Sequence, residues 1–231
     1  MKFFVHQKAL AINDFTEALT IFTNLLTEIS QQPNQKDNES LEVHLFCELF
    51  ATGYPLQDLC YDKNFIENYD DFLFKLNNIS QQFPLKKSII LFGGLRYQFF
   101  DEERKKINSI HNVIYRLSPG ESVQDIYQKK VIPREGIFDE VKYFSPGNSS
   151  SFFSYEGTNM GLFICEDTWS YAYEKSMALQ EFEKELKEKG EKVDVIINFS
   201  ASPYTTEKKD LRREMMKDIS SRFKVPSLYV N

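Results

Sequence analysis

The feature that most constrains the fold of this chain is a short apolar run that is followed directly by acidic residues. Residues 160–169 read MGLFICEDTW. Residues 161–164 are apolar at every position, which is typical of a strand buried on both faces. Two carboxylates follow Cys165, so we expect this cysteine at the C-terminal end of the strand. In open α/β sheets that edge is where ligands bind. Taken alone, however, a single cysteine is more often buried core than nucleophile.

Apolar segments and amphipathic segments alternate along the rest of the chain. The predicted strands are 2–5, 43–47, 88–92 (closed by Gly93 and Gly94), 193–197 and 227–231, with hairpins joining 110–117 to 123–127 and 152–155 to 160–164. The predicted helices start after Asp14, cover 65–76 and 171–189, and carry Leu211, Met215, Ile219 and Phe223 on a last apolar face. This order predicts a single α/β domain with a mixed sheet or two sheets.

Charge and cysteine usage exclude several classes of protein. The 231 residues include 28 basic and 34 acidic side chains, a net charge of −6, which argues against a nucleic-acid surface. The three cysteines have no CxxC spacing, so neither a disulfide framework nor a zinc site is indicated. No apolar run is long enough to span a membrane. We therefore expect a soluble cytoplasmic protein without a metal centre.

Polar residues occur at the ends of several predicted strands, where packing in an apolar core does not account for them. They are Glu48, Cys165 and residues 198–202, and the loop after Tyr127 adds two lysines, Lys129 and Lys130. A thiol needs a base or a cation to become a thiolate. Glu48 is a candidate base because burial would raise its pKa, and a lysine beside the thiol would favour the anion.

Histidine is the usual partner of a reactive cysteine. Here His6, His44 and His111 fall in or near early strands rather than at their C-terminal edges. A Cys/His arrangement is therefore disfavoured. From spacing alone, a set of glutamate, lysine and cysteine is one possibility, and a structural role for each residue stays open.

Four segments around these glutamate, lysine and cysteine residues resemble motifs of a known family. ELFATGYPLQDL, KKVIPREGIFDEVKYFSPG, GLFICEDTW and NFSASPYTTEKKDLR together resemble the nitrilase, or carbon–nitrogen hydrolase, superfamily. Within this superfamily, the motif sequences most resemble those of the glutaminase domains of glutamine-dependent NAD⁺ synthetases. The resemblance runs from the first strand to Asn231 and implies an α-β-β-α sandwich.

Residue roles follow from the resemblance, motif by motif. It implies that Glu48 is the general base, Lys129 the catalytic lysine and Cys165 the nucleophile, with Lys130 as the alternative if the alignment shifts by one. It also implies that Glu140 orients the lysine, although Glu140 could be an exposed acid.

The glutamine pocket follows in the same way. The implied lining residues are Tyr54, Glu166, Ser200 and Ser202, and the backbone N–H of Glu166 would help hold the oxyanion. Packing by Tyr54 and turn formation by the serines are the plain alternatives. We expect Cys47 and Cys60 to be core residues.

The implied activity is hydrolysis of L-glutamine, with ammonia passed to a synthetase domain or subunit. ATP and Mg²⁺ would be needed only in that synthetase part, whose SGGxDS loop is absent from this sequence. The family also leads us to expect a homo-oligomer. Residues 1–231 would form one domain, ending where the family has further strands.

Two other functions stay open. Glu135 replaces a tyrosine of the family motif, which would alter the pocket and favours a stand-alone amidase acting on another small amide. A non-catalytic interaction subunit is the third reading.

Overall fold

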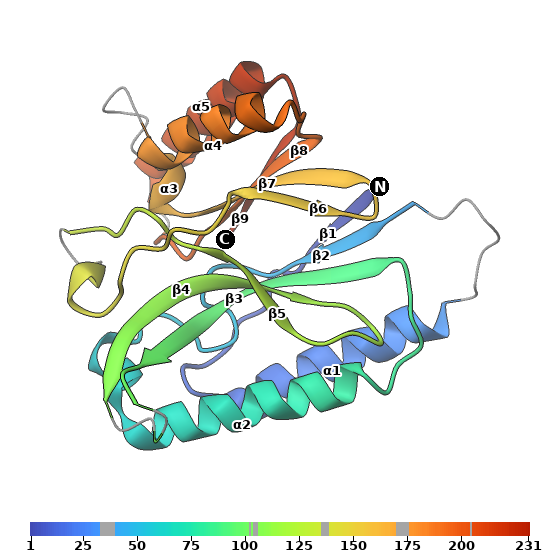
Figure 1. The fold of residues 1–231 in the computed structure, drawn as a ribbon, viewed down its shortest axis with the longest axis vertical. Helices are drawn as coiled ribbons and strands as arrows, with labels where there is room; N and C mark the ends of the chain where they lie inside the picture. The colour runs from blue at the N-terminus through green and yellow to red at the C-terminus, as the bar shows by residue number, and fades with distance from the viewer. Residues whose placement is uncertain (33–39, 102, 104–105, 135–138, 170–175, 204) are drawn as a thin grey trace.

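The strands form two sheets (Figure 1). The computed structural model describes residues 1–231 except 33–39, 102, 104–105, 135–138, 170–175 and 204. The first sheet has the order β1 (Lys2–Val5), β2 (Glu42–Leu45), β3 (Ser88–Phe99), β4 (Ile107–Leu117) and β5 (Gln124–Gln128). The second has the order β6 (Phe152–Tyr155), β7 (Thr158–Ile164), β8 (Val195–Phe199) and β9 (Ser227–Val230).

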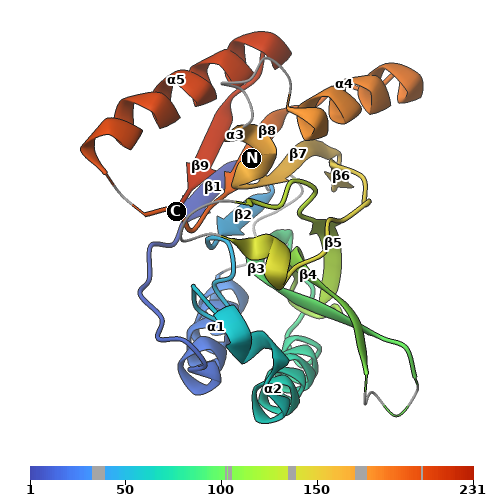
Figure 2. The ribbon, with the colours of Figure 1, turned by 90° about the vertical axis from the view of Figure 1, so that its left-hand side faces the viewer.

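Helices cover the outer face of each sheet. The helices are α1 (Phe15–Gln31), α2 (Lys63–Ser80), α3 (Glu166–Trp169), α4 (Met177–Lys189) and α5 (Thr206–Phe223), with short 3₁₀ turns η1 (Gln57–Tyr61) and η3 (Glu140–Lys142). In Figure 1, α1 and α2 lie below the first sheet, and α4 and α5 lie above the second. Figure 2 shows the same layers after a quarter turn. The predicted α-β-β-α sandwich is confirmed.

Three apolar layers hold the sandwich together. One joins α1 and α2 to the first sheet, one fills the space between the sheets, and one joins the second sheet to α4 and α5. The middle layer includes Ile114 from the first sheet and Leu162 from the second, both fully buried. Each Å² of buried apolar surface stabilises the folded state by about 25 cal/mol, so these layers are the main source of stability.

The parallel direction of the strands in each sheet explains why residues that follow different strands lie close together. β1, β2 and β3 are parallel, as are β7, β8 and β9. Ile164, Phe199 and Val230 pair at the C-terminal ends of the second group. Cys165 and Ser200, which follow Ile164 and Phe199, therefore lie next to each other at the C-terminal ends of β7 and β8.

Several local predictions are confirmed. The Asp14 side chain accepts the Glu17 N–H at 3.0 Å, so α1 starts where its capping pattern places it. Phe22, Leu26 and Ile29 of α1 are buried. Both predicted hairpins are antiparallel pairs, β4 with β5 and β6 with β7.

Other predictions are wrong in their extent. β2 ends at Leu45 rather than at residue 47. β3 continues through Gly93 and Gly94 to Phe99, since both glycines pair with β4 instead of closing the strand. The strand predicted at 193–197 is shifted to Val195–Phe199.

The last two helices also differ from prediction. Met177 is the first residue of α4, whose N-cap is Ser176, while 171–175 lie outside the described residues. Leu211 of α5 is 54% exposed, so it does not belong to the apolar face with Met215 and Ile219. None of the helices among the described residues is long and apolar enough to cross a bilayer.

Candidate active site

Glu48 lies just beyond β2 and is buried. The chain can turn there because it passes directly over Gly93, where a Cβ would lie 2.2 Å from the Leu49 backbone nitrogen. The Glu48 carboxylate accepts Asn112 Nδ2 on Oε1 and the Ala201 backbone N–H on Oε2, both at 2.8 Å. Since Asn112 belongs to β4 and Ala201 follows β8, this carboxylate bridges the two sheets.

Lys129 follows β5 and is 1% exposed. Its backbone is held by two hydrogen bonds, from Lys129 N–H to the Asn112 carbonyl and from Gly147 N–H to the Lys129 carbonyl. Its Nζ donates to Glu48 Oε1 and to Glu140 Oε2, each at 2.7 Å. Burial alone would lower the pKa of Lys129, but the two carboxylates outweigh it and raise that pKa well above its ordinary value. The lysine is therefore a fixed positive charge at neutral pH.

Glu140 is buried in η3 and is the second carboxylate that binds the Lys129 ammonium. Its other oxygen accepts the Tyr54 hydroxyl at 3.1 Å. Burial raises the pKa of Glu140, while the charge of Lys129 opposes that rise. Burial also raises the pKa of Tyr54, and the neighbouring carboxylates of Glu140 and Glu48 add to it. Tyr54 is therefore a neutral hydrogen-bond donor.

Cys165 occupies a sharp turn between β7 and α3. Its φ of 43° is left-handed, and its N–H bonds the Phe199 carbonyl at 2.7 Å. Such backbone strain in a non-glycine residue is concentrated at functional sites. Burial and then the Glu48 carboxylate raise the pKa of the Cys165 thiol to about 12, against the opposing effects of Lys129 and a hydrogen bond with Ser200. The sulfur thus carries its proton at rest, within the electrostatic reach of Glu48 and Lys129.

Ser200 connects the thiol to β9. Its Oγ accepts the Tyr229 hydroxyl at 2.8 Å, and its side chain also bonds Cys165. The guanidinium of Arg212 lies over the Tyr229 ring, 5.4 Å from the centroid. The structure therefore places Ser200 against the sulfur itself.

Ser202 and Glu166 lie nearby. The Ser202 N–H bonds the Asn231 side chain at 2.9 Å, and its carbonyl accepts from Arg212 at 3.0 Å. Glu166 is half-buried; burial raises its pKa and the Lys129 charge opposes that rise. Substrate contact by either residue stays a prediction.

Two residues of this site were missed by sequence reasoning. Asn112 supports Glu48 from β4. Because His111 and Arg116 are polar residues of the same strand, nothing in the sequence singles Asn112 out. Asp167, two residues after Cys165, is fully buried and accepts the backbone N–H groups of Val131 and Ile164. Its place in the CEDTW motif was noted, but nothing local distinguished it from Glu166.

The residues weighed as alternatives lie elsewhere. Lys130 forms an ion pair with Glu181 at 2.8 Å, so the lysine between the carboxylates is Lys129. Cys60 is buried in the outer core, and Cys47 is half-buried between two apolar layers. Glu135 lies outside the described residues.

The histidines have other partners. His6 Nε2 and His44 Nδ1 are 2.9 Å apart, and His111 bonds Ser109 and the Ser145 carbonyl. Within the described part of the chain, no group of three or more His, Cys, Asp or Glu side chains is placed to hold a metal ion.

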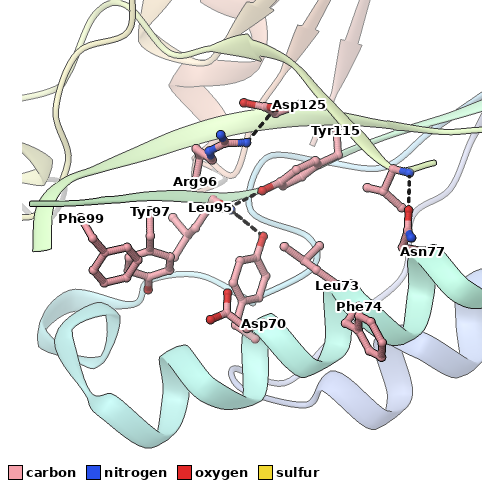
Figure 3. Close-up of a pocket in the computed structure, with 12 residues that line it drawn as sticks. Asp70, Leu73, Phe74, Asn77, Leu95, Arg96, Tyr97, Phe99, Tyr115 and Asp125 are labelled. Carbon is pink, nitrogen blue, oxygen red and sulfur yellow. Dashed lines mark hydrogen bonds and ion pairs between the residues drawn. The ribbon is translucent and has the colours of Figure 1, made fainter. Parts of the chain in front are cut away.

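A separate cavity of about 430 Å³ lies between α2 and the β3–β4 hairpin (Figure 3). Its polar groups bind one another: Arg96 pairs with Asp125 at 3.1 Å, and the Tyr115 hydroxyl donates to the Leu95 carbonyl at 2.6 Å. None of the predicted site residues lines this cavity.

Comparison with known proteins identifies the family. The sequence profile of carbon–nitrogen hydrolases matches residues 13–187. The chain belongs to the carbon–nitrogen hydrolase family. As a member of that family it is an enzyme of the hydrolase class, as predicted.

Similar sequences to this carbon–nitrogen hydrolase include two bacterial glutamine-dependent NAD⁺ synthetases. The Synechocystis protein is 29% identical over 189 residues, covering 80% of this chain and 32% of that protein. The Acinetobacter baylyi protein is 27% identical over 201 residues, covering 87% and 32%. The chain thus spans about a third of the length of these relatives.

Similar folds include both synthetases and amidases. A glutamine-dependent NAD⁺ synthetase from Acinetobacter baumannii has a TM-score of 0.71 at 21% identity, with 96% of this hydrolase and 36% of that chain covered. A nitrilase-superfamily amidase from Nesterenkonia has a TM-score of 0.67 at 16% identity, covering 99% and 74%. At these identities the likeness establishes the fold alone.

Proposed function

We propose that this carbon–nitrogen hydrolase releases ammonia from the side-chain amide of glutamine, with Glu48, Lys129 and Cys165 as its reacting set. The observation that carries this proposal is the buried Lys129 ammonium, bonded to Glu48 and Glu140 and within electrostatic reach of the Cys165 thiol. A cation held permanently in place can stabilise negative charge that develops on a substrate oxygen.

The first half of the reaction forms a thioester. Glu48 Oε2, which has a second lone pair besides the one that accepts Ala201 N–H, takes the proton from Cys165 Sγ. The sulfur then attacks the amide carbon, and the oxygen gains a negative charge beside Lys129 and the backbone N–H of Glu166. Glu48 returns its proton to the amide nitrogen, the C–N bond breaks, and ammonia leaves.

The second half regenerates the enzyme. Glu48 takes a proton from water as the water oxygen attacks the thioester carbon. The C–S bond breaks, the sulfur recovers its proton, and the acid product leaves. Glu140 keeps Lys129 in place throughout, and Tyr54 in turn holds Glu140.

Glutamine is the proposed substrate because the similar sequences are named as glutamine-dependent NAD⁺ synthetases. Ammonia would pass to a synthetase domain or subunit, and ATP and Mg²⁺ would be used there. Tyr54, Glu166, Ser200 and Ser202 are the proposed contacts around the substrate.

Ammonia release from glutamine tests the proposal. Release by the wild-type chain is expected to vanish in Cys165→Ala and to persist in Cys60→Ser, a matched change at a buried thiol that bonds the Gln57 carbonyl. Faster release from other small amides would favour the stand-alone amidase instead. An absence of release from any amide, with Cys165 unreactive toward iodoacetamide, would contradict both enzyme hypotheses and favour the interaction subunit.

A further inference from the structure

A single buried carboxylate ties the lysine segment to the cysteine turn. Asp167 is fully buried, two residues after Cys165. Its Oδ1 accepts the backbone N–H groups of Lys130 at 3.0 Å and Val131 at 2.8 Å. Its Oδ2 accepts the Ile164 backbone N–H at 2.9 Å and the Tyr127 hydroxyl at 2.8 Å.

These four donors match an ionised carboxylate. A carboxylate has about four acceptor positions on its two oxygens, whereas a protonated carboxyl group or an amide has fewer. Burial raises the pKa of Asp167 to about 6, with the bonds from Ile164 and Val131 opposing that rise, so the group is ionised at neutral pH.

The donors come from both sides of the site. Tyr127 lies in β5 of the first sheet, and Lys130 and Val131 follow that strand, so the three flank Lys129. Ile164 is the last residue of β7 and directly precedes Cys165. The Lys129 backbone is bonded on its other side to Asn112 and Gly147. Asp167 therefore limits how far the lysine segment can move relative to the thiol.

We infer that Asp167 is a positioning residue that fixes Lys129 relative to Cys165 across the junction of the two sheets. The inference rests on the proposed function, because it assigns to Asp167 the spacing on which that chemistry depends. A displacement of about 1 Å at a reacting centre can cost about 100-fold in rate.

Asp167→Asn is the decisive variant. The amide has nearly the same shape, but its NH₂ group would face donors, so at least one backbone N–H loses its acceptor. We expect kcat, normalised to the folded fraction, to fall about 100-fold while KM changes less than about threefold. Asp194→Asn is the matched control, since Asp194 also accepts a backbone N–H, that of Asn159, but is exposed near the start of β7.

Alkylation of Cys165 by iodoacetamide separates positioning from folding. Displacing the Lys129 charge lowers the thiolate fraction, so we expect alkylation of Asp167→Asn to slow by about tenfold at pH 8. Partial unfolding would expose the thiol and accelerate alkylation. Unchanged or faster alkylation in a folded variant, or a wild-type kcat, would overturn the inference.

Tyr127→Phe keeps the inference testable if Asp167→Asn does not fold. It removes one of the four hydrogen bonds and retains the ring that packs on Phe163. We expect a folded protein whose kcat is lower by about 3- to 10-fold, with wild-type kcat as the contrary result. If the wild type releases no ammonia from any amide, the proposed function fails. The alkylation rates then still test the positioning role.

Discussion

At the scale of single residues, the site is defined by one cation between two carboxylates. Lys129, Glu48 and Glu140 are each less than a twentieth exposed. Their charges are therefore stabilised by one another and by hydrogen bonds from Asn112, Ala201 and Tyr54 rather than by water. Removing one member of such a group leaves an uncompensated charge, which is far more costly than the pair is worth.

Lys129→Met is predicted to abolish hydrolysis and to lower the free energy of unfolding by about 3–5 kcal/mol. It leaves Glu48 and Glu140 facing each other without a cation. Lys130→Met is the matched control, because it removes only an ion pair to the half-exposed Glu181. That control should cost less than about 1 kcal/mol and retain activity. Urea unfolding and ammonia assays measure both effects, and equal losses in the two variants would contradict the assignment of Lys129.

What could be predicted at this scale depended on the motifs. Spacing placed Cys165 at a strand end, but only the resemblance distinguished Lys129 from Lys130. The contact between Lys129 and Glu140 was implied by the resemblance alone, because a separation of 11 residues along the chain does not by itself bring two side chains together.

At the scale of secondary-structure elements, Gly93 decides where Glu48 lies. The sequence indicated a strand end at Gly93 and Gly94, because glycine pairs usually mark turns. In the structure the strand continues, and glycine is required for a different reason: the chain after β2 crosses β3 in direct contact with it. Local patterns do not report a close approach between segments that are far apart in the sequence.

Gly93→Ala is predicted to destabilise the fold by about 3 kcal/mol or more and to abolish activity. The added Cβ would meet Leu49 backbone atoms, and moving them moves Glu48. Gly157→Ala serves as the control: its φ of 73° is strained for alanine, but open space surrounds the site, so about 1 kcal/mol is expected. Thermal unfolding compares the two variants. Wild-type stability in Gly93→Ala would show that the backbone can yield.

Two histidines, His6 after β1 and His44 in β2, should make the stability of the fold depend on pH. Burial, then the charge of His6, lowers the pKa of His44 to about 4, with Glu42 opposing; burial and Lys8 lower the pKa of His6, with Glu28 opposing. Because the folded-state pKa lies below the unfolded value of about 6.5, stability present above pH 6.5 is lost as the pH falls toward 4.

Between pH 6.5 and pH 4, the melting temperature of the wild type should therefore fall relative to that of His44→Phe. That variant keeps a ring stacked on Phe4 but removes the ionisable group. Scanning calorimetry across this range measures both slopes. Identical slopes in the two proteins would place the pH dependence elsewhere.

At the scale of the whole molecule, the two sheets share the middle apolar layer and the active site. The sequence predicted one domain with one or two sheets, and the order of strands and helices was enough for that. It did not reveal which strand faces meet, because Ile114 and Leu162 read simply as buried strand positions.

Unfolding is predicted to be a single cooperative transition. Fluorescence of Trp169, the only tryptophan, reports on the second sheet, while far-ultraviolet circular dichroism reports on the whole chain. Ile114→Ala lies in the first sheet but faces the second, so it should lower stability by about 2–5 kcal/mol and shift both signals together. Separate midpoints for the two signals would mean that the sheets unfold independently.

The division of the site between the sheets has a consequence for how the protein is made. Glu48 and Lys129 leave the ribosome with the first sheet, and Cys165 follows with the second. Until the sheets dock, Cys165 lies near neither Glu48 nor Lys129, the residues proposed as its base and its cation. The three side chains can therefore meet only after both sheets have been synthesised and have docked.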